Sequence, residues 1–102
     1  MALTREHILA RLKAMQPDIA ERYGVEIFGL VGSWARGEAG PDSDIDVVYH
    51  LDETRRVSLL DLGGVWSDLN DSLNRHIDLI DWKMLKDRQK KLMQKDLIRF
   101  YG

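Results

Sequence analysis

Two aspartates separated by one residue, Asp44 and Asp46, stand at the start of an apolar stretch. The residues that alternate with them, Ile45 and Val47, are β-branched and indicate a strand with one packed face. Residues i and i+2 of a strand project from the same face, so the two carboxylates lie side by side. Like charges this close repel each other unless a cation lies between them. Because Mg²⁺ is commonly held by carboxylates, phosphate oxygens and water, the pattern predicts a magnesium site.

A third acidic residue, Asp78, has a similar setting between Ile77 and Leu79, early in another apolar stretch. If the two strands are neighbours, three carboxylates meet at one end of the sheet. This arrangement suits phosphoryl-type transfer with two metal ions, about 3.5–4 Å apart, that hold the attacking and leaving oxygens. Asp81 is an alternative, but a residue three positions further along a strand faces the opposite side. We therefore predict that Asp78 completes the metal site.

The pair Gly32-Ser33 follows directly on the apolar run Val25–Val31. A strand that turns into a helix at this point directs free backbone N–H groups and the positive end of the helix dipole at an anion. Gly32 lets the backbone approach closely, and the Ser33 hydroxyl adds a donor. Arg36, one turn later, can reach a phosphate or an acidic side chain. A phosphate cradle beside a metal site predicts a nucleoside triphosphate with its Mg²⁺ ions.

The run GSWARG (32–37), followed by SDID (43–46), resembles the signature of the DNA polymerase β-like nucleotidyltransferases, which is Gly-Ser, ten residues and Asp-x-Asp. Together with GVEIFGLV, RHIDLIDW and IRFYG, the resemblance covers nearly the whole chain and is closest to the minimal subgroup, the MNT domains. It implies that Asp78 activates the attacking hydroxyl. The metal ligands it implies are Asp44, Asp46 and Asp78, and the nucleotide-binding residues are Gly32, Ser33, Arg36 and Ser43. One departure is Gly40, where many relatives have an arginine, and we expect it to bear on nucleotide affinity.

The resemblance also implies a partner. Stand-alone MNT domains commonly pair with a small helical HEPN protein, often an RNase toxin, and silence it as its antitoxin. In some pairs they transfer AMP from ATP to a tyrosine of the toxin, so we expect ATP, two Mg²⁺ ions and a HEPN toxin as partners. Two alternatives stay open. One is an antitoxin that acts by binding alone. The other is a nucleotidyltransferase for small molecules, although that class usually needs a second domain.

Composition limits the remaining function classes. The 102 residues, 44% of them hydrophobic and 31% charged, predict one domain over residues 1–102. A net charge of −2 gives no general attraction to membranes or nucleic acid, so we expect no direct nucleic-acid binding. The absence of cysteine excludes disulfides and thiolate metal sites. The charged N-terminus and the lack of a long uncharged stretch predict a soluble, cytoplasmic protein without membrane contact.

The other residues whose side chains could take part in catalysis or binding are predicted to have structural roles. Ser33 lacks the Gly-x-Ser-x-Gly pattern of a serine nucleophile. The histidines His7, His50 and His76 lack the spacing of metal ligands, and we expect Trp34, Trp66 and Trp82 to be packing residues. The segment from Lys83 to Arg99 is basic, which usually indicates a solvated helix face. The alternative for this segment is a patch for RNA or for an acidic partner.

The elements that must position these residues alternate between helix and strand. Thr4 is the expected N-cap of a first helix that ends at Gly24, with Pro17 kinking or restarting it. The predicted strands are 25–31, 44–51 and 76–82. The predicted helices are 33–38, 58–74, with an unexplained Gly63-Gly64 pair, and 83 to about 95. Residues 97–101 form an apolar tail of no assigned form. This order predicts an α/β (α+β) fold with a small mixed sheet and helices packed against it, as in the polymerase β-like family.

Overall fold

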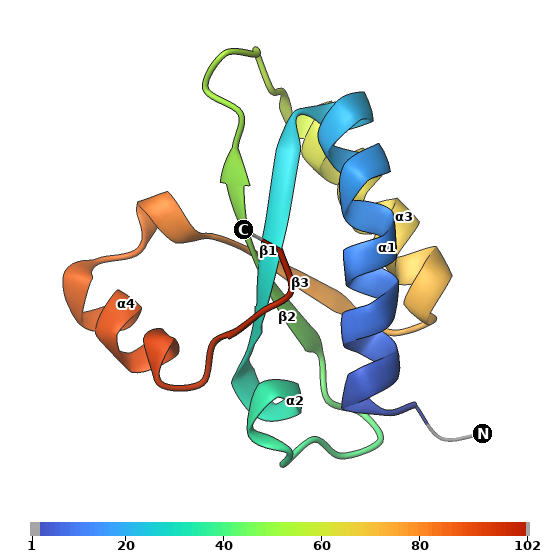
Figure 1. Cartoon of the computed structure of the whole chain (residues 1–102), viewed down its shortest axis with the longest axis vertical. Coiled ribbons are helices and arrows are strands. Elements are labelled where there is room, and N and C mark those ends of the chain that lie inside the picture. Colours follow the sequence, from blue (N-terminus) through green and yellow to red (C-terminus); the bar gives the residue numbers. More distant parts are fainter. Residues whose placement is uncertain (1–2, 102) are drawn as a thin grey trace.

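A four-stranded mixed sheet organises the computed structural model, which describes residues 3–101 (Figure 1). Its strand order is β3-β2-β1-β4. Strand β1 runs antiparallel to β2 and β4, whereas β2 and β3 are parallel. The elements are α1 (Arg5–Tyr23), β1 (Val25–Val31), α2 (Gly32–Arg36), β2 (Ile45–Leu51), α3 (Leu59–Leu73), β3 (Ile77–Asp81), the 3₁₀ turn η1 (Trp82–Met84), α4 (Asp87–Gln94) and β4 (Ile98–Arg99). The predicted mixed α/β fold is confirmed.

Capping residues delimit the long helices as their types predict. Thr4 accepts a hydrogen bond from the His7 N–H at 3.1 Å and begins α1, and Gly24, with φ 71°, ends it. Ser58 accepts a hydrogen bond from the Asp61 N–H at the start of α3. No helix of the described part of the chain is long and apolar enough to cross a membrane.

Helix α1 continues through Pro17, so of the two predicted outcomes the restart as a second helix is wrong, and the kink stays a prediction. Proline removes one backbone hydrogen bond of the helix. Leu12 and Ile19, on either side of Pro17, are both buried. Gln16 adds a hydrogen bond at 2.8 Å from the Ile27 N–H to its side-chain oxygen. Packing on both sides of the proline therefore holds α1 against the sheet as one continuous helix.

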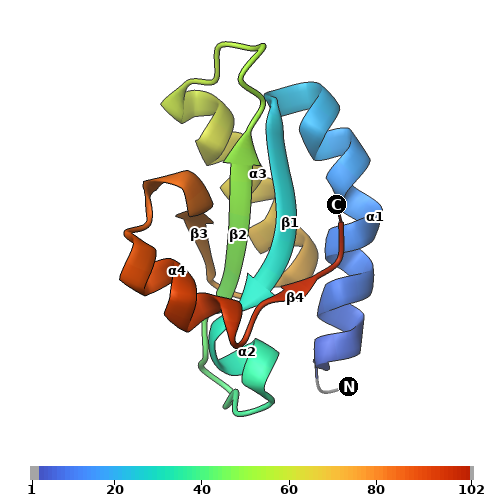
Figure 2. The same ribbon diagram turned by 60° about the vertical axis from the view of Figure 1, so that its left-hand side comes forward.

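The two faces of the sheet have different covers. Helices α1 and α3 lie on one face and α4 lies on the other (Figures 1 and 2). The larger core fills the space under α1 and α3 and contains Ile45, Val47 and Ile77. Asp46 and Asp78 alternate with these residues along their strands, so both carboxylates project from the opposite face, toward α4.

The C-terminal segment differs from its prediction. The expected helix from Lys83 to about Lys95 is divided into η1 and α4, because the Asp81 side chain caps the Lys83 N–H and the Gln89 side chain accepts from the Lys86 N–H. The tail to which no form was assigned contributes β4, which pairs with β1 at Gly29 and Leu30.

The Gly63-Gly64 pair in α3 has two different environments. A Cβ at Gly64 would overlap the ring of Tyr23, whereas a Cβ at Gly63 would have nothing within 4 Å. We expect Gly64→Ala to lower the free energy of unfolding by about 1–3 kcal/mol through overpacking. Gly63→Ala should raise it by about 0.5–1 kcal/mol, because alanine favours the helix. Urea denaturation of the two variants measures both effects, and equal signs would contradict this assignment.

Candidate active site

Two of the three predicted carboxylates face each other across a pair of parallel strands. The register of β2 and β3 places Asp46 opposite Asp78. Both line a hollow of about 370 Å³ between the sheet and α4, with Gly32 and Arg36 on its wall. The other lining residues are Val31, Ile80, Leu92, Met93 and Asp96. The structure therefore brings together four residues that the sequence selected from three separate segments.

Gly32 joins β1 to α2 directly beside Asp46. Its φ is 78°, a left-handed conformation that residues with a Cβ adopt only at a cost. A Cβ at Gly32 would also overlap the Oδ2 atom of Asp46. The group that closely approaches Gly32 in the structure is a carboxylate of the same chain, for which only glycine leaves room, and the approach of a phosphate stays a prediction.

The Asp46 carboxylate has a pKa raised to about 6. Burial is the main cause, the negative charges of Asp78 and Asp44 add to it, and the positive charge of Arg36 opposes it. A carboxylate held near two others and short of a countercharge is suited to a hard divalent cation, which prefers oxygen ligands. Asp46 and Asp78 therefore fit Mg²⁺ by their chemistry and by their shared position in the hollow.

Asp44 lies outside this hollow. It precedes β2 rather than beginning it, and its Oδ1 atom lies 3.2 Å from Nδ1 of His76. Within residues 3–101, no group of three or more acidic or histidine side chains lies close enough to hold a metal ion. The structure thus pairs Asp46 with Asp78 and leaves Asp44 beside them, so the role of Asp44 as a metal ligand stays a prediction.

The two predicted serines have mainly structural contacts here. Ser33 is half-buried in α2, and its carbonyl accepts a hydrogen bond from the Glu38 N–H at 2.9 Å. The Ser43 hydroxyl accepts a hydrogen bond from the Gly40 N–H at 2.9 Å, and its carbonyl accepts one from Trp34 Nε1. Ser43 and Gly40 thereby close the loop that leads from α2 to β2. Nucleotide binding by the serines stays a prediction.

Arg36 takes the second of its two predicted partners, an acidic side chain. It forms ion pairs at 3.1 Å with Glu38 and with Asp96, which lies in the turn after α4. These carboxylates raise the pKa of the guanidinium above its ordinary value. Sequence reasoning missed Asp96, and the only signal was an isolated acidic residue in a basic segment. The Arg36–Asp96 pair connects α2 to the segment that covers the hollow.

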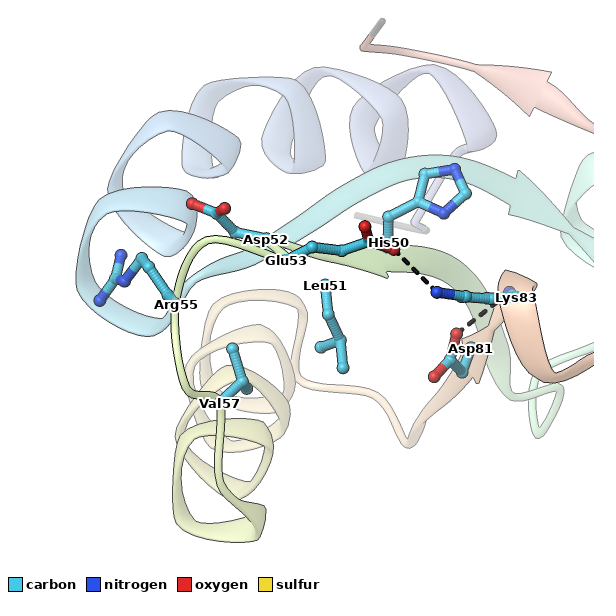
Figure 3. Close-up of a pocket in the computed structure, with 8 residues that line it drawn as sticks. All are labelled: His50, Leu51, Asp52, Glu53, Arg55, Val57, Asp81 and Lys83. Atoms are coloured by element: carbon cyan, nitrogen blue, oxygen red, sulfur yellow. Dashed lines mark hydrogen bonds and ion pairs between the residues drawn. The ribbon is translucent and has the colours of Figure 1, made fainter.

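Asp81 lies in a second hollow, as its position along β3 predicts. This hollow, of about 470 Å³, is also lined by His50, Leu51, Asp52, Glu53, Arg55, Val57 and Lys83 (Figure 3). Lys83 donates to Glu53 at 2.8 Å, and its backbone N–H donates to Asp81 at 3.1 Å. These charged groups satisfy one another, so the larger hollow is the weaker candidate for catalysis.

The raised pKa of Asp46 makes stability depend on pH. At pH values below 3.8 the carboxyl is protonated in the folded and unfolded states alike, so its ionisation has no effect on stability. Between 3.8 and about 6 only the unfolded chain has lost the proton, so stability falls as pH rises, and above 6 the loss is complete.

Asp46→Asn removes this loss. In metal-free buffer we expect it to raise Tm at about pH 7.5 by a few degrees, equivalent to roughly 1 kcal/mol for a half-exposed group. At about pH 3.5 the variant and the wild type should melt together. Thermal melts with EDTA at both pH values test this, and a variant that melts below the wild type at neutral pH would contradict it.

Comparisons with known proteins identify the family of this chain. Residues 8–100 match the model of the nucleotidyltransferase domain family. This chain belongs to that family. It is 33% identical over 96 residues to the protein adenylyltransferase MntA of Thermococcus cleftensis, covering 94% of this chain and 95% of the relative. The predicted identity as a nucleotidyltransferase is confirmed.

Solved structures place this nucleotidyltransferase among the minimal ones. A structure assigned to the minimal nucleotidyltransferases superposes with a TM-score of 0.76 at 29% identity, covering 94% of this chain and 95% of that one. The MNT fold also appears in a complex of a tri-AMPylated HEPN toxin with an MNT antitoxin from Shewanella oneidensis. That match has a TM-score of 0.67 at 13% identity and covers 97% of this chain and 73% of that chain, so it shows the shared fold alone.

Proposed function

We propose that this nucleotidyltransferase transfers AMP from ATP to a tyrosine hydroxyl of a HEPN toxin in the cytoplasm and so acts as the toxin's antitoxin. The observation that carries the proposal is the pairing of Asp46 with Asp78 beside the Gly32 turn. The name of the Thermococcus relative supports the reaction. The Shewanella complex suggests the kind of acceptor.

The residues of the hollow divide the chemistry between them. The turn at Gly32 and Ser33 would bind the triphosphate through backbone N–H groups, and Asp46, Asp78 and Asp44 would hold two Mg²⁺ ions. When bound, Mg²⁺ neutralises phosphate charge and polarises the reacting oxygens. Asp78 accepts the proton of the acceptor hydroxyl as its oxygen bonds to the α-phosphorus. The bond to the β-phosphate breaks, and pyrophosphate leaves.

A macromolecular acceptor fits the openness of the site. Asp78 is exposed at the hollow, and Leu92, on the opposite wall, is 58% exposed. Within residues 3–101, both sides of the hollow are therefore open to solvent and enclose a small acceptor poorly. A docked protein surface can supply the positioning of the acceptor, which contributes much of the rate in group transfer.

Intact-mass spectrometry tests the proposal. The chain is mixed with a HEPN partner, ATP and Mg²⁺, and the partner should gain one or more AMP units. Replacing the acceptor tyrosine of the partner with phenylalanine should prevent the gain. A partner that is inhibited on mixing but never changes mass, with any of the four nucleotides, would show that the antitoxin acts by binding alone.

A further inference from the structure

The charges of this chain are distributed unevenly along its sequence. Seven of the 15 basic residues, but only two of the 17 acidic residues, lie between Lys83 and Arg99. This segment is therefore strongly basic, whereas the rest of the chain is acidic. Figure 2 shows α4 in front of β2 and β3. Leu92, Met93 and Asp96 of this segment line the hollow that contains Asp46 and Asp78.

Helix α4 presents a basic face at the mouth of this hollow. None of its residues is buried, and its partly buried contact with the sheet is made by Met93. Leu92 lines the hollow and is 58% exposed. Arg88 lies one turn before Leu92, and Lys95, which keeps helical dihedral angles, lies one turn after it. With the adjacent Lys91, these residues form what we call the α4 face: Arg88, Lys91, Leu92 and Lys95.

The basic groups of the α4 face have no acidic partners in the fold. Within residues 3–101, no carboxylate lies within salt-bridge distance of Arg88, Lys91 or Lys95, whereas Arg36 pairs with two carboxylates and Lys83 with one. Like charges three and four residues apart on a helix also destabilise it slightly. The α4 face therefore does not serve the stability of the chain, and its charge suits an anionic partner.

The in-line geometry of the transfer indicates that the α4 face meets the acceptor rather than the triphosphate. The attacking and leaving oxygens lie on opposite sides of the phosphorus in an in-line displacement. The triphosphate is proposed to lie on the Gly32 side of the hollow, so the acceptor enters from the opposite side. In the strand order β3-β2-β1, Asp78 and Ile80 of β3 lie across β2 from Gly32, and Leu92 of α4 lines the same hollow.

We propose, on the basis of the function above, that the α4 face docks an acidic segment of the acceptor protein and so selects a hydroxyl flanked by aspartate or glutamate. The exposed Leu92 among the charges fits a peptide that combines an aromatic or apolar residue with carboxylates. An RNA strand fits less well, because the α4 face has no aromatic side chain for base stacking and the hollow itself is acidic.

Peptide binding tests the docking surface without requiring transfer. Labelled peptides of equal length, with one central tyrosine flanked by glutamate, glutamine or lysine, are titrated with the full chain by fluorescence anisotropy. The glutamate peptide should bind at least about tenfold more tightly than the glutamine peptide and weaken with added salt. The charge reversal Arg88→Glu/Lys91→Glu should weaken binding of the glutamate peptide about tenfold relative to the wild-type chain.

Lys13→Glu/Arg56→Glu is the matched control, because both residues are exposed and the charge change is the same. It should leave binding of the glutamate peptide nearly unchanged. An equal loss of affinity for the glutamate peptide in both double variants would show that only net charge matters and would overturn the proposal. So would equal binding of the glutamate and glutamine peptides, or preferential binding of an oligouridine.

Two further outcomes separate this inference from its premise. Weaker ATP binding in Arg88→Glu/Lys91→Glu by calorimetry would assign α4 to the triphosphate and overturn the docking proposal. Glutamate-specific binding without AMP transfer to any peptide or HEPN partner would instead contradict the proposed transferase activity and support the docking surface. Transfer without preference among the peptides would remove the docking surface alone.

Discussion

We expect Asp46→Asn and Asp78→Asn each to reduce AMP transfer by at least about a thousandfold and to leave the fold intact. The two carboxylates face each other across β2 and β3, and both line the hollow from the sheet side. An amide keeps the shape of either side chain but loses the charge that holds a divalent cation. Label transfer from radioactive ATP measures the rate, and circular dichroism measures the fold.

Asp81→Asn is the control for this result. Asp81 lies on the same strand, three residues after Asp78, and lines the other hollow. Its loss should leave transfer within a few-fold of the wild type. The rate of Asp44→Asn then shows whether Asp44, which lies 3.2 Å from His76 in the structure, also contributes to the metal site. Wild-type rates for Asp46→Asn and Asp78→Asn would remove the metal-dependent mechanism altogether.

Gly32→Ala should reduce transfer about a hundredfold at a modest cost in stability. The left-handed φ of 78° makes alanine unfavourable by about 1–2 kcal/mol. In addition, the new Cβ would overlap Asp46 Oδ2, so the carboxylate must turn away from its position opposite Asp78. A catalytic group displaced by about 1 Å can lose a hundredfold in rate.

Gly37→Ala is the control that separates the effect of backbone strain from the effect of displacing the Asp46 carboxylate. Gly37 has nearly the same backbone conformation, with φ 75°, but a Cβ there would come no closer than 3.9 Å to another group, the guanidinium of Arg5. Both variants should lose similar stability in urea denaturation, whereas only Gly32→Ala should lose activity. Equal activities of the two variants would show that the approach of Asp46 to Gly32 has no catalytic role.

The elements of this fold that depend on local patterns were predictable from sequence. Thr4, Gly24 and Ser58 mark helix ends by capping chemistry that acts within a few residues. The restart considered at Pro17 does not occur, because packing of Leu12 and Ile19, invisible in the local pattern, offsets the lost hydrogen bond. Strand β4 was not assigned because two residues carry no periodic signal, and their pairing partners, Gly29 and Leu30, lie in the distant strand β1.

In the candidate site, too, the residues placed by strand periodicity were predictable, and the contacts between distant segments were not. The alternation of Asp46 and Asp78 with apolar residues identifies the face they share, and the structure places them together. Asp96 could not be found because its partner, Arg36, is 60 residues away in sequence. The position of Asp44 beside His76 also depends on how the loops before β2 and β3 meet. Strand periodicity says nothing about such loops.

The parallel pairing of β2 with β3 has a consequence for the order in which this enzyme assembles. The antiparallel pair β1–β2 joins neighbouring segments, but β3 reaches β2 only after α3 has crossed the sheet. Pairings between distant segments form slowly, because the loop must close before any contact rewards it. Asp46 therefore meets Asp78 late in folding. We expect a nascent chain that ends before β3 to be catalytically silent, so that nucleotide turnover begins only when the sheet is complete.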